Sequence, residues 1–124
     1  MNAQAALTSF WRGFGWDAFD ENSVPDNAFA TRSQYITYSS PQGFFDEPIM
    51  QNASLWMRST SWGEIVEKMQ QIAEYIGLGG KLIKTDSGYL WIKRGTPFAQ
   101  RMSDEDPAVR RIYLNLEIEF FTSK

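Results

Sequence analysis

The last part of the chain decides the fold, and it reads Ile112-Tyr113-Leu114-Asn115-Leu116-Glu117-Ile118-Glu119-Phe120-Phe121. Apolar side chains occupy every second position as far as Phe120, and most of the positions between them are polar. Because successive side chains of a strand point to opposite faces, this alternation predicts a strand with one buried face. The other face carries Glu117 and Glu119. A catalytic carboxylate pair needs two facing walls of a cleft, so we interpret this face as one that meets solvent or another subunit.

A helix is predicted upstream of this strand, at residues 62–76. Its apolar side chains recur at intervals of three and four, at Ile65, Val66, Met69, Ile72, Ala73 and Ile76. Ser61 and Glu64 match the S-x-x-E capping box, in which side chains bond the free N–H groups of the first turn. Gly77 is the residue type that commonly ends a helix.

Between this helix and the last strand, the sequence predicts a hairpin and then a long loop. Residues 81–85 and 89–94 flank Asp86-Ser87-Gly88, where glycine is expected to supply the positive φ of a turn. Residues 95–107 contain two prolines and follow neither helical nor strand spacing, which predicts a long connection. Long loops in compact domains are commonly functional.

The first half of the chain is predicted to supply one helix, one loop and two strands. Residues 3–14 have helical apolar spacing and are ended by glycines. Residues 16–33 are polar and interrupted by proline, which is typical of an ordered loop. Residues 35–39 and 49–58 are predicted strands, the first of them stopped by a turn at residues 40–43.

These elements predict an α+β fold, with a mostly antiparallel sheet of four to five strands and helices packed on one face. Residues 1–124 are short enough to form a single domain. The order of elements would also allow a right-handed crossover from the second strand through the long helix to the third strand. Trp56 and Trp91 fall on strand faces opposite their aliphatic neighbours, so we expect some aromatic surface to be left for a partner.

The composition excludes several classes of function. The 124 residues include no cysteine and no histidine, which removes disulfides, thiol nucleophiles, Ser-His pairs and the usual zinc sites. We therefore predict a protein that is not an enzyme and has no cofactor, metal or small-molecule substrate. No apolar run approaches the ~18 residues of a membrane span, and the N-terminus does not resemble a signal peptide, so we expect an intracellular protein without a membrane partner. The net charge of −3 argues against general affinity for nucleic acid.

Three local motifs have competing interpretations. The glycine-rich Gly77-Leu78-Gly79-Gly80-Lys81 follows a helix instead of preceding one, which favours a helix stop over a phosphate-binding loop. The run from Asp104 to Asp106 lacks the ligand spacing of a calcium loop and is interpreted as solvated charge. Basic residues cluster around the hairpin: Lys81, Lys84, Lys93 and Arg94, with Arg101 nearby. They could bind nucleic acid, or they could contact protein and protect a sheet edge. Protein contact and edge protection are the favoured interpretation.

Four segments together resemble a known family. They lie at residues 53–62, 73–77, 88–100 and 110–117, and the longest reads Gly88-Tyr89-Leu90-Trp91-Ile92-Lys93-Arg94-Gly95-Thr96-Pro97-Phe98-Ala99-Gln100. A weaker likeness precedes them at residues 24–25 and 35–38. Over residues 53 to about 120, the chain resembles the tail terminator (tail completion) proteins of long-tailed bacteriophages.

The resemblance implies a structural virion protein without enzymatic activity. Copies of it, commonly six, would form a ring on the head-proximal end of the tail tube, stopping its polymerisation and presenting the surface that the filled head joins. The implied partners are further copies of the chain, the tail tube protein and the head-tail connector protein, and DNA would pass through the ring without specific binding. The protein would be made in the host cytoplasm and would reside in the virion tail.

The predicted loop at residues 95–107 is our candidate subunit interface, with contacts at Phe98, Arg101, Asp104, Glu105 and Asp106. Opposite charges on one projecting loop suit a head-to-tail ring, in which each portion would meet a different neighbouring surface. Two alternatives remain open. One is a head-side adaptor or connector protein of the same virion, a class that is usually more helical, and the other is a nucleic-acid-binding module that uses the basic cluster.

Overall fold

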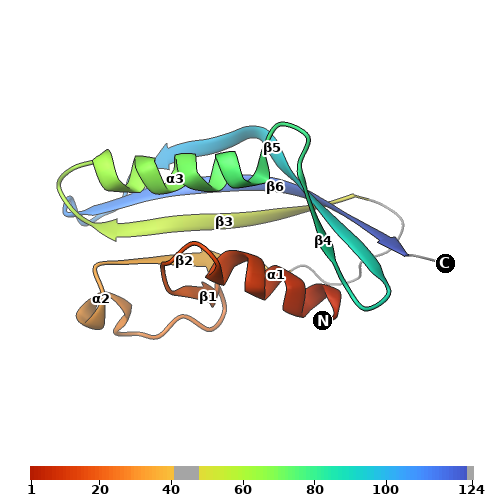
Figure 1. Ribbon diagram of the computed structural model, residues 1–124. Coiled ribbons are helices and arrows are strands. Elements are labelled where there is room, and N and C mark those ends of the chain that lie inside the picture. The colour runs from red at the N-terminus through yellow and green to blue at the C-terminus, as the bar shows by residue number, and fades with distance from the viewer. Residues whose placement is uncertain (41–47, 123–124) are drawn as a thin grey trace.

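The computed structural model describes residues 1–40 and 48–122, and their strands form one curled sheet (Figure 1). The six strands lie in the order β1-β2-β3-β6-β5-β4. Their bounds are Ala18–Asp20 for β1, Gln34–Tyr38 for β2, Ile49–Arg58 for β3, Lys81–Lys84 for β4, Gly88–Met102 for β5 and Val109–Thr122 for β6.

The predicted final strand lies in the middle of this sheet. β6 pairs with β3 over ten positions, from Ile49 opposite Ile118 to Arg58 opposite Val109. On its other side β6 pairs with β5, so β6 has a hydrogen-bonded neighbour along both of its edges. Four residues of its apolar row, at every second position from Ile112 to Ile118, are buried, which confirms the predicted alternation.

Two helices cover the same face of the sheet (Figure 1). They are α1, Ala3–Arg12, and α3, Gly63–Ile76, and both contribute to one core cluster with the inward side chains of the strands. The helices also touch each other, because the Phe10 ring of α1 lies 6.0 Å from the Tyr75 ring of α3. Just after α1, the Phe14 carbonyl accepts from Lys68 Nζ of α3 over 2.6 Å. A buried amide ties α1 to the sheet: Trp11 Nε1 donates to Gln51 Oε1 over 3.1 Å.

The sheet is larger than predicted and is not wholly antiparallel. Residues 16–33, predicted as a loop, contain β1 and the short helix α2, Ala28–Thr31. β1 pairs in parallel with β2, whose Ile36 N–H bonds the Asp17 carbonyl over 2.8 Å. A strand of three residues is too short to show a period-two pattern, so only its pairing reveals it. α2 departs from the predicted helix layer, because its Phe29 packs on Tyr35 of the opposite sheet face.

The prediction of a long loop at residues 95–107 is wrong. β5 continues to Met102, with Ala99–Met102 opposite Leu114–Arg111, and the connection to β6 is a turn at residues 103–108. A bulge between Arg94 and Ala99 interrupts the pairing, and it holds Pro97, which could not donate to a regular ladder. Glycine is required at position 95, because a Cβ there would lie 2.8 Å from the Asn115 carbonyl oxygen.

Other local predictions meet mixed outcomes. Gly77 ends α3 with a φ of 76°, as expected. The Ser61 capping box does not form: Trp62 is the N-cap with near-helical dihedrals, and the Ser61 hydroxyl instead accepts from the Gly63 N–H over 3.1 Å. Gly88 closes the predicted hairpin by accepting from the Thr85 N–H, but without positive φ.

The crossover that the order of elements would allow does not form. β3 is antiparallel to β6, β6 to β5 and β5 to β4, so β3 and β4 run in opposite directions and are separated by two strands. A crossover would require parallel strands. The turn predicted at residues 40–43 lies mostly outside the described residues.

Two core truncations test which sides of α3 and β6 face the core. Ile72 on α3 and Leu116 on β6 are both fully buried. Replacing either by alanine should lower the free energy of unfolding by about 2–5 kcal/mol, because each removes buried methyl groups and leaves a cavity. Urea denaturation measures the change, with Gln70→Ala on the exposed side of α3 as the control. A loss equal to that of the control would contradict the facing.

Candidate subunit interface

Among residues 1–40 and 48–122, no helix covers the central strands on the second face of the sheet. Directly opposite residues in paired strands share a face, so the registers place Trp56 beside Arg111, Ser54 beside Tyr113 and Lys93 beside Glu117 on this outer face. Trp56 and Trp91 are both half-buried there, which agrees with the expectation that aromatic surface remains for a partner.

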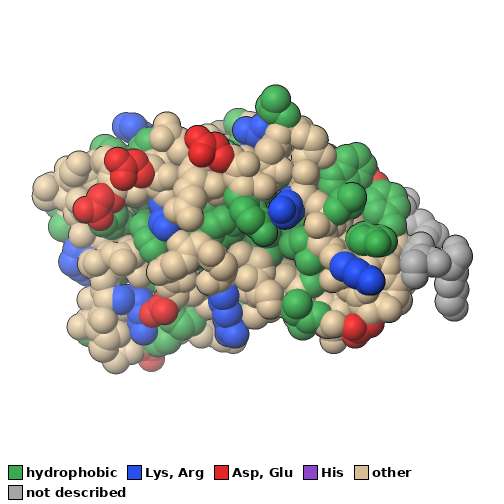
Figure 2. All heavy atoms as spheres, in the orientation of Figure 1, with side chains coloured by type: hydrophobic (Ala, Val, Ile, Leu, Met, Phe, Trp, Pro, Cys, Tyr) green, Lys and Arg blue, Asp and Glu red, His purple; other side chains and the backbone are tan. Residues whose placement is uncertain are grey.

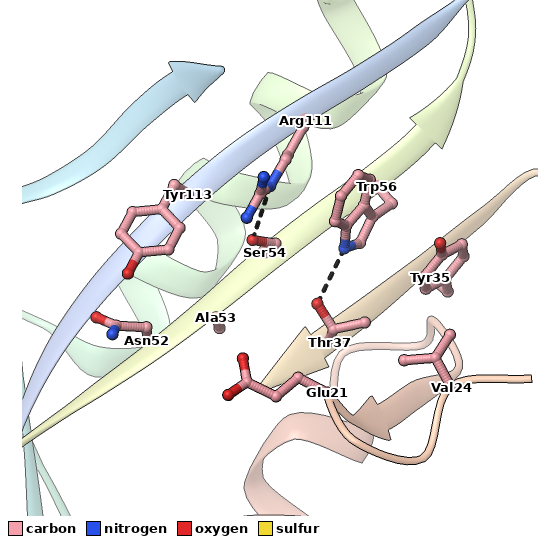
Figure 3. A pocket seen from close by; sticks show the side chains of 10 residues that line it. All are labelled: Glu21, Val24, Tyr35, Thr37, Asn52, Ala53, Ser54, Trp56, Arg111 and Tyr113. Carbon is pink, nitrogen blue, oxygen red and sulfur yellow. Dashed lines mark hydrogen bonds between the residues drawn. The ribbon is translucent and has the colours of Figure 1, made fainter. Parts of the chain in front are cut away.

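Trp56 is fixed in position from several directions (Figure 3). Its ring stacks on Tyr35, with centroids 6.1 Å apart, and its indole N–H donates to the Thr37 hydroxyl over 2.9 Å. The guanidinium of Arg111 lies 4.6 Å from the same ring on the other side. Burial is the main reason that the pKa of Tyr35 is raised, and the Asp104 charge adds to this effect. The phenol therefore stays neutral as a hydrogen-bonding group.

Arg111 is held in a defined orientation above the sheet. Its Nε donates to Ser54 Oγ over 3.1 Å, and the Tyr113 ring lies 5.8 Å from the guanidinium carbon (Figure 3). Arg111 lines a hollow of about 240 Å³ that Glu21 and Asn52 also border. One cation, one carboxylate and several neutral polar groups thus suit ion pairing and hydrogen bonding with another surface.

The two glutamates of the last strand share one cation. Lys93 Nζ lies 3.1 Å from Glu119 Oε1 and 3.8 Å from Glu117 Oε1, and it also sits 4.1 Å from the centroid of the Trp91 ring. These groups form a band across β5 and β6 in which two carboxylates share one cation. Within the described residues, no group of three or more acidic side chains is arranged to hold a metal ion.

An apolar hollow continues the outer face towards the hairpin end. Its lining is wholly apolar and consists of Leu82, Tyr89, Trp91 and Phe121, around a volume of about 380 Å³. Leu82 is 59% exposed, and Tyr89 and Phe121 are each 42% exposed. Hydrophobic side chains also gather at this hairpin end in Figure 2.

The structure does not place all the predicted interface residues on one loop, although Arg101, Asp104 and Asp106 line one hollow of about 250 Å³. Phe98 lies in the bulge of β5, half-buried against the core. Arg101 is exposed further along β5, with its guanidinium 4.7 Å from the Trp62 ring. Asp104, Glu105 and Asp106 are exposed in the turn between β5 and β6.

The predicted basic cluster is divided between the two faces. Lys84 and Lys93 fall on the outer face, whereas Lys81 and Arg94 are opposite buried residues and fall on the helix side. Lys81 lies 4.6 Å from the Tyr75 ring of α3. On the side shown in Figure 2, basic side chains are likewise spread among acidic and polar ones. The position of Lys81 and Lys84 on the edge strand β4 agrees with protection of an edge.

Sequence reasoning missed Arg58 and Arg110 at the opposite end of the molecule, although it named Arg101 there. Arg101 and Arg110 both lie over the Trp62 ring, and Arg58 lies over Phe29 and pairs with Asp106 over 3.2 Å. The available signal was the adjacent pair Arg110-Arg111 at the start of a predicted strand. Its aromatic partners are far away in sequence, so only the strand register shows the stacking.

Comparisons with known proteins identify the fold. No protein-family model matches the chain, and no curated protein sequence matches it. A solved chain from a structure titled "Virion of native gene transfer agent (GTA) particle" superposes with a TM-score of 0.64. The match covers 96% of this chain and 94% of that chain at 16% sequence identity, so the two share the fold over nearly their whole lengths. In the described residues, no helix is long and apolar enough to cross a membrane.

The Asp106 carboxylate makes the stability of the β5–β6 turn depend on pH. It accepts from the Ala108 N–H and from Arg58, and the backbone bond is the main cause that lowers its pKa below 3.8. Stability from these bonds is therefore present above pH 3.8 and is lost as the pH falls through the lower folded pKa. Asp106→Asn should flatten the dependence of the urea midpoint on pH in this acidic range, whereas Glu105→Gln should not. Equal slopes in wild type and Asp106→Asn would show that the turn is not held by this carboxylate.

Proposed function

We propose that this chain is a non-enzymatic structural subunit of a phage-like particle that works by docking against other subunits. The carrying observation is the shared fold, over 96% of the chain, with a chain of the gene transfer agent virion. That likeness concerns the fold, and the outer sheet face supplies independent support from this chain's own residues. It presents half-buried aromatic rings and an oriented arginine, which are residue types enriched in protein interfaces.

In finer detail, we propose a tail terminator that forms a ring, commonly of six copies, at the head-proximal end of a tail tube. A closed ring needs a heterologous interface, in which one patch of each subunit meets a different patch of its neighbour. This chain carries chemically different patches: the Arg111 hollow, the band around Lys93 and the apolar hollow by β4. Different patches allow one ring face to match the tube and the other to match a head-tail connector protein.

The chemistry of the described surface agrees with a docking role. The groups around the Arg111 hollow already bond one another, as Trp56 does with Thr37 and Arg111 with Ser54. Such bonds orient side chains before contact and reduce the ordering cost of association. On this proposal DNA passes through the ring without specific binding, and the protein resides in the virion.

Tail length provides the direct test of the terminator role. In the parent particle, removal of this gene should give tails of irregular and excessive length that do not join heads, as seen by negative-stain electron microscopy. Complementation with the wild-type gene is the control. Tails of normal length without attached heads would instead identify a head-side adaptor, and normal infectious particles would refute a virion role.

Charge reversal at Arg111 tests the outer face as the docking surface. Arg111→Glu should leave the circular dichroism spectrum unchanged, because the side chain lies outside the core, but it should prevent assembly by removing the oriented cation. The matched control is Arg12→Glu, the same reversal at an exposed arginine at the end of α1. Sedimentation velocity of the purified protein and complementation of the deletion measure the effect. If both variants assemble and complement equally, the outer face is not the interface.

A further inference from the structure

The edge strand β4 presents backbone groups that its neighbour does not use. Among the described residues it pairs only with β5, with Leu82 opposite Trp91 and Lys84 opposite Tyr89. The Thr85 N–H donates to the Gly88 carbonyl, so that pair is hydrogen-bonded, and bonded pairs alternate along an antiparallel ladder. The N–H and C=O groups of Leu82 and Lys84 are therefore directed away from β5. The chain's own Met1 lies only at the hairpin end of β4, where its carbonyl accepts from the Asp86 N–H over 2.9 Å.

The same two residues carry their side chains on the outer face, next to the apolar hollow. Leu82 forms one wall of the hollow and Trp91 lies directly opposite it. The indole N–H of Trp91 already donates to the Gly79 carbonyl over 2.8 Å, and its ring lies 6.0 Å from that of Phe121. The hollow thus offers ring and aliphatic surface to an apolar side chain, with no buried polar group left to satisfy.

The charge of Lys84 indicates which side chain a bound segment would carry next to the apolar one. Lys84 is exposed two residues from Leu82 on the same face, and it forms no ion pair with the described residues. The lysine further along this face, Lys93, is in contrast balanced by Glu117 and Glu119. An acidic side chain next to Lys84 would therefore be favoured, and a basic one disfavoured.

We propose that β4 binds an extended segment of another polypeptide as an additional strand of the sheet. The segment carries an apolar side chain beside Leu82 and an acidic side chain beside Lys84. Since side chains on one strand face are two residues apart, the recognised pattern is acidic-x-apolar for an antiparallel segment, and apolar-x-acidic for a parallel one. This partner chemistry goes beyond the proposed virion role and does not depend on it.

Binding of two synthetic peptides to the purified full chain tests the proposal. Both are short, threonine-rich and fluorescein-labelled; one contains Glu-Thr-Leu and the other Leu-Thr-Glu. Fluorescence polarisation should show that one of them binds, that Lys84→Glu or Leu82→Ser weakens binding by about tenfold or more, and that added salt weakens it as well. Arg12→Glu, at the C-terminal end of α1, is the matched charge-reversal control and should bind as wild type.

Backbone methylation of the bound peptide distinguishes strand addition from apolar docking alone. N-methyl groups at the alternate residues whose N–H groups face β4 should abolish binding, whereas the same groups at the intervening residues should not. This comparison needs no protein variant, so it stands even if a substitution unfolds the chain. Equal effects of the two methylation patterns, or affinities weaker than about 1 mM for both parent peptides, would overturn the proposal. Self-association that Leu82→Ser abolishes, without peptide binding, would assign the edge to a second copy instead.

Discussion

The ten-residue register between β3 and β6 is the constraint on which the rest of the structure depends. It places Leu55 opposite Ile112 and Ala53 opposite Leu114, so that the apolar rows of both strands face the same side. A slip of one residue would turn every apolar side chain of one strand to the other face. The register therefore fixes at once which surface α1 and α3 cover and which surface stays open.

The same register determines which side chains lie on the outer face, and these side chains are the ones available for docking. The positions between the apolar ones must point outward, which brings Trp56, Arg111 and Tyr113 together from two strands. Because these side chains are half-buried and bond one another, they form a stable surface with few flexible groups. A surface of this kind loses little conformational entropy when it binds another surface.

The bulge in β5 allows this face to extend from one end of the molecule to the other. Residues 95–98 interrupt the ladder with β6, and the Asn115 side chain bonds the Pro97 carbonyl within the gap over 3.0 Å. Pairing resumes at Ala99, so that Gln100 and Met102 lie on the outer face beside Tyr113 and Arg111. Without the bulge, Pro97 would end the strand, because it has no N–H to donate to a regular ladder. The two halves of β5 instead present separate surfaces on one continuous sheet.

The sequence by itself determined the elements whose patterns are long enough to read. Alternation identified β3 and β6 with their faces, helical spacing identified α1 and α3, and the burial of Ile72 and Leu116 confirms both patterns. Alternation also predicted that Trp56 and Trp91 would face away from the core. Period-two and helical spacing are local properties, so they need no knowledge of which strands are neighbours.

Only the tertiary structure decided which residues meet. The parallel pairing of β1 is a property of two segments, and so are the bulge opposite Asn115 and the stacking of Arg111 on Trp56. The predicted interface residues gather only in part, and the basic cluster is divided, for the same reason. Phe98 and Asp106 are close in sequence but belong to a strand and a turn, and Lys81 and Lys84 point to opposite faces of one strand. Proximity in sequence does not imply a shared surface, because the strand period and the register assign each side chain to its face.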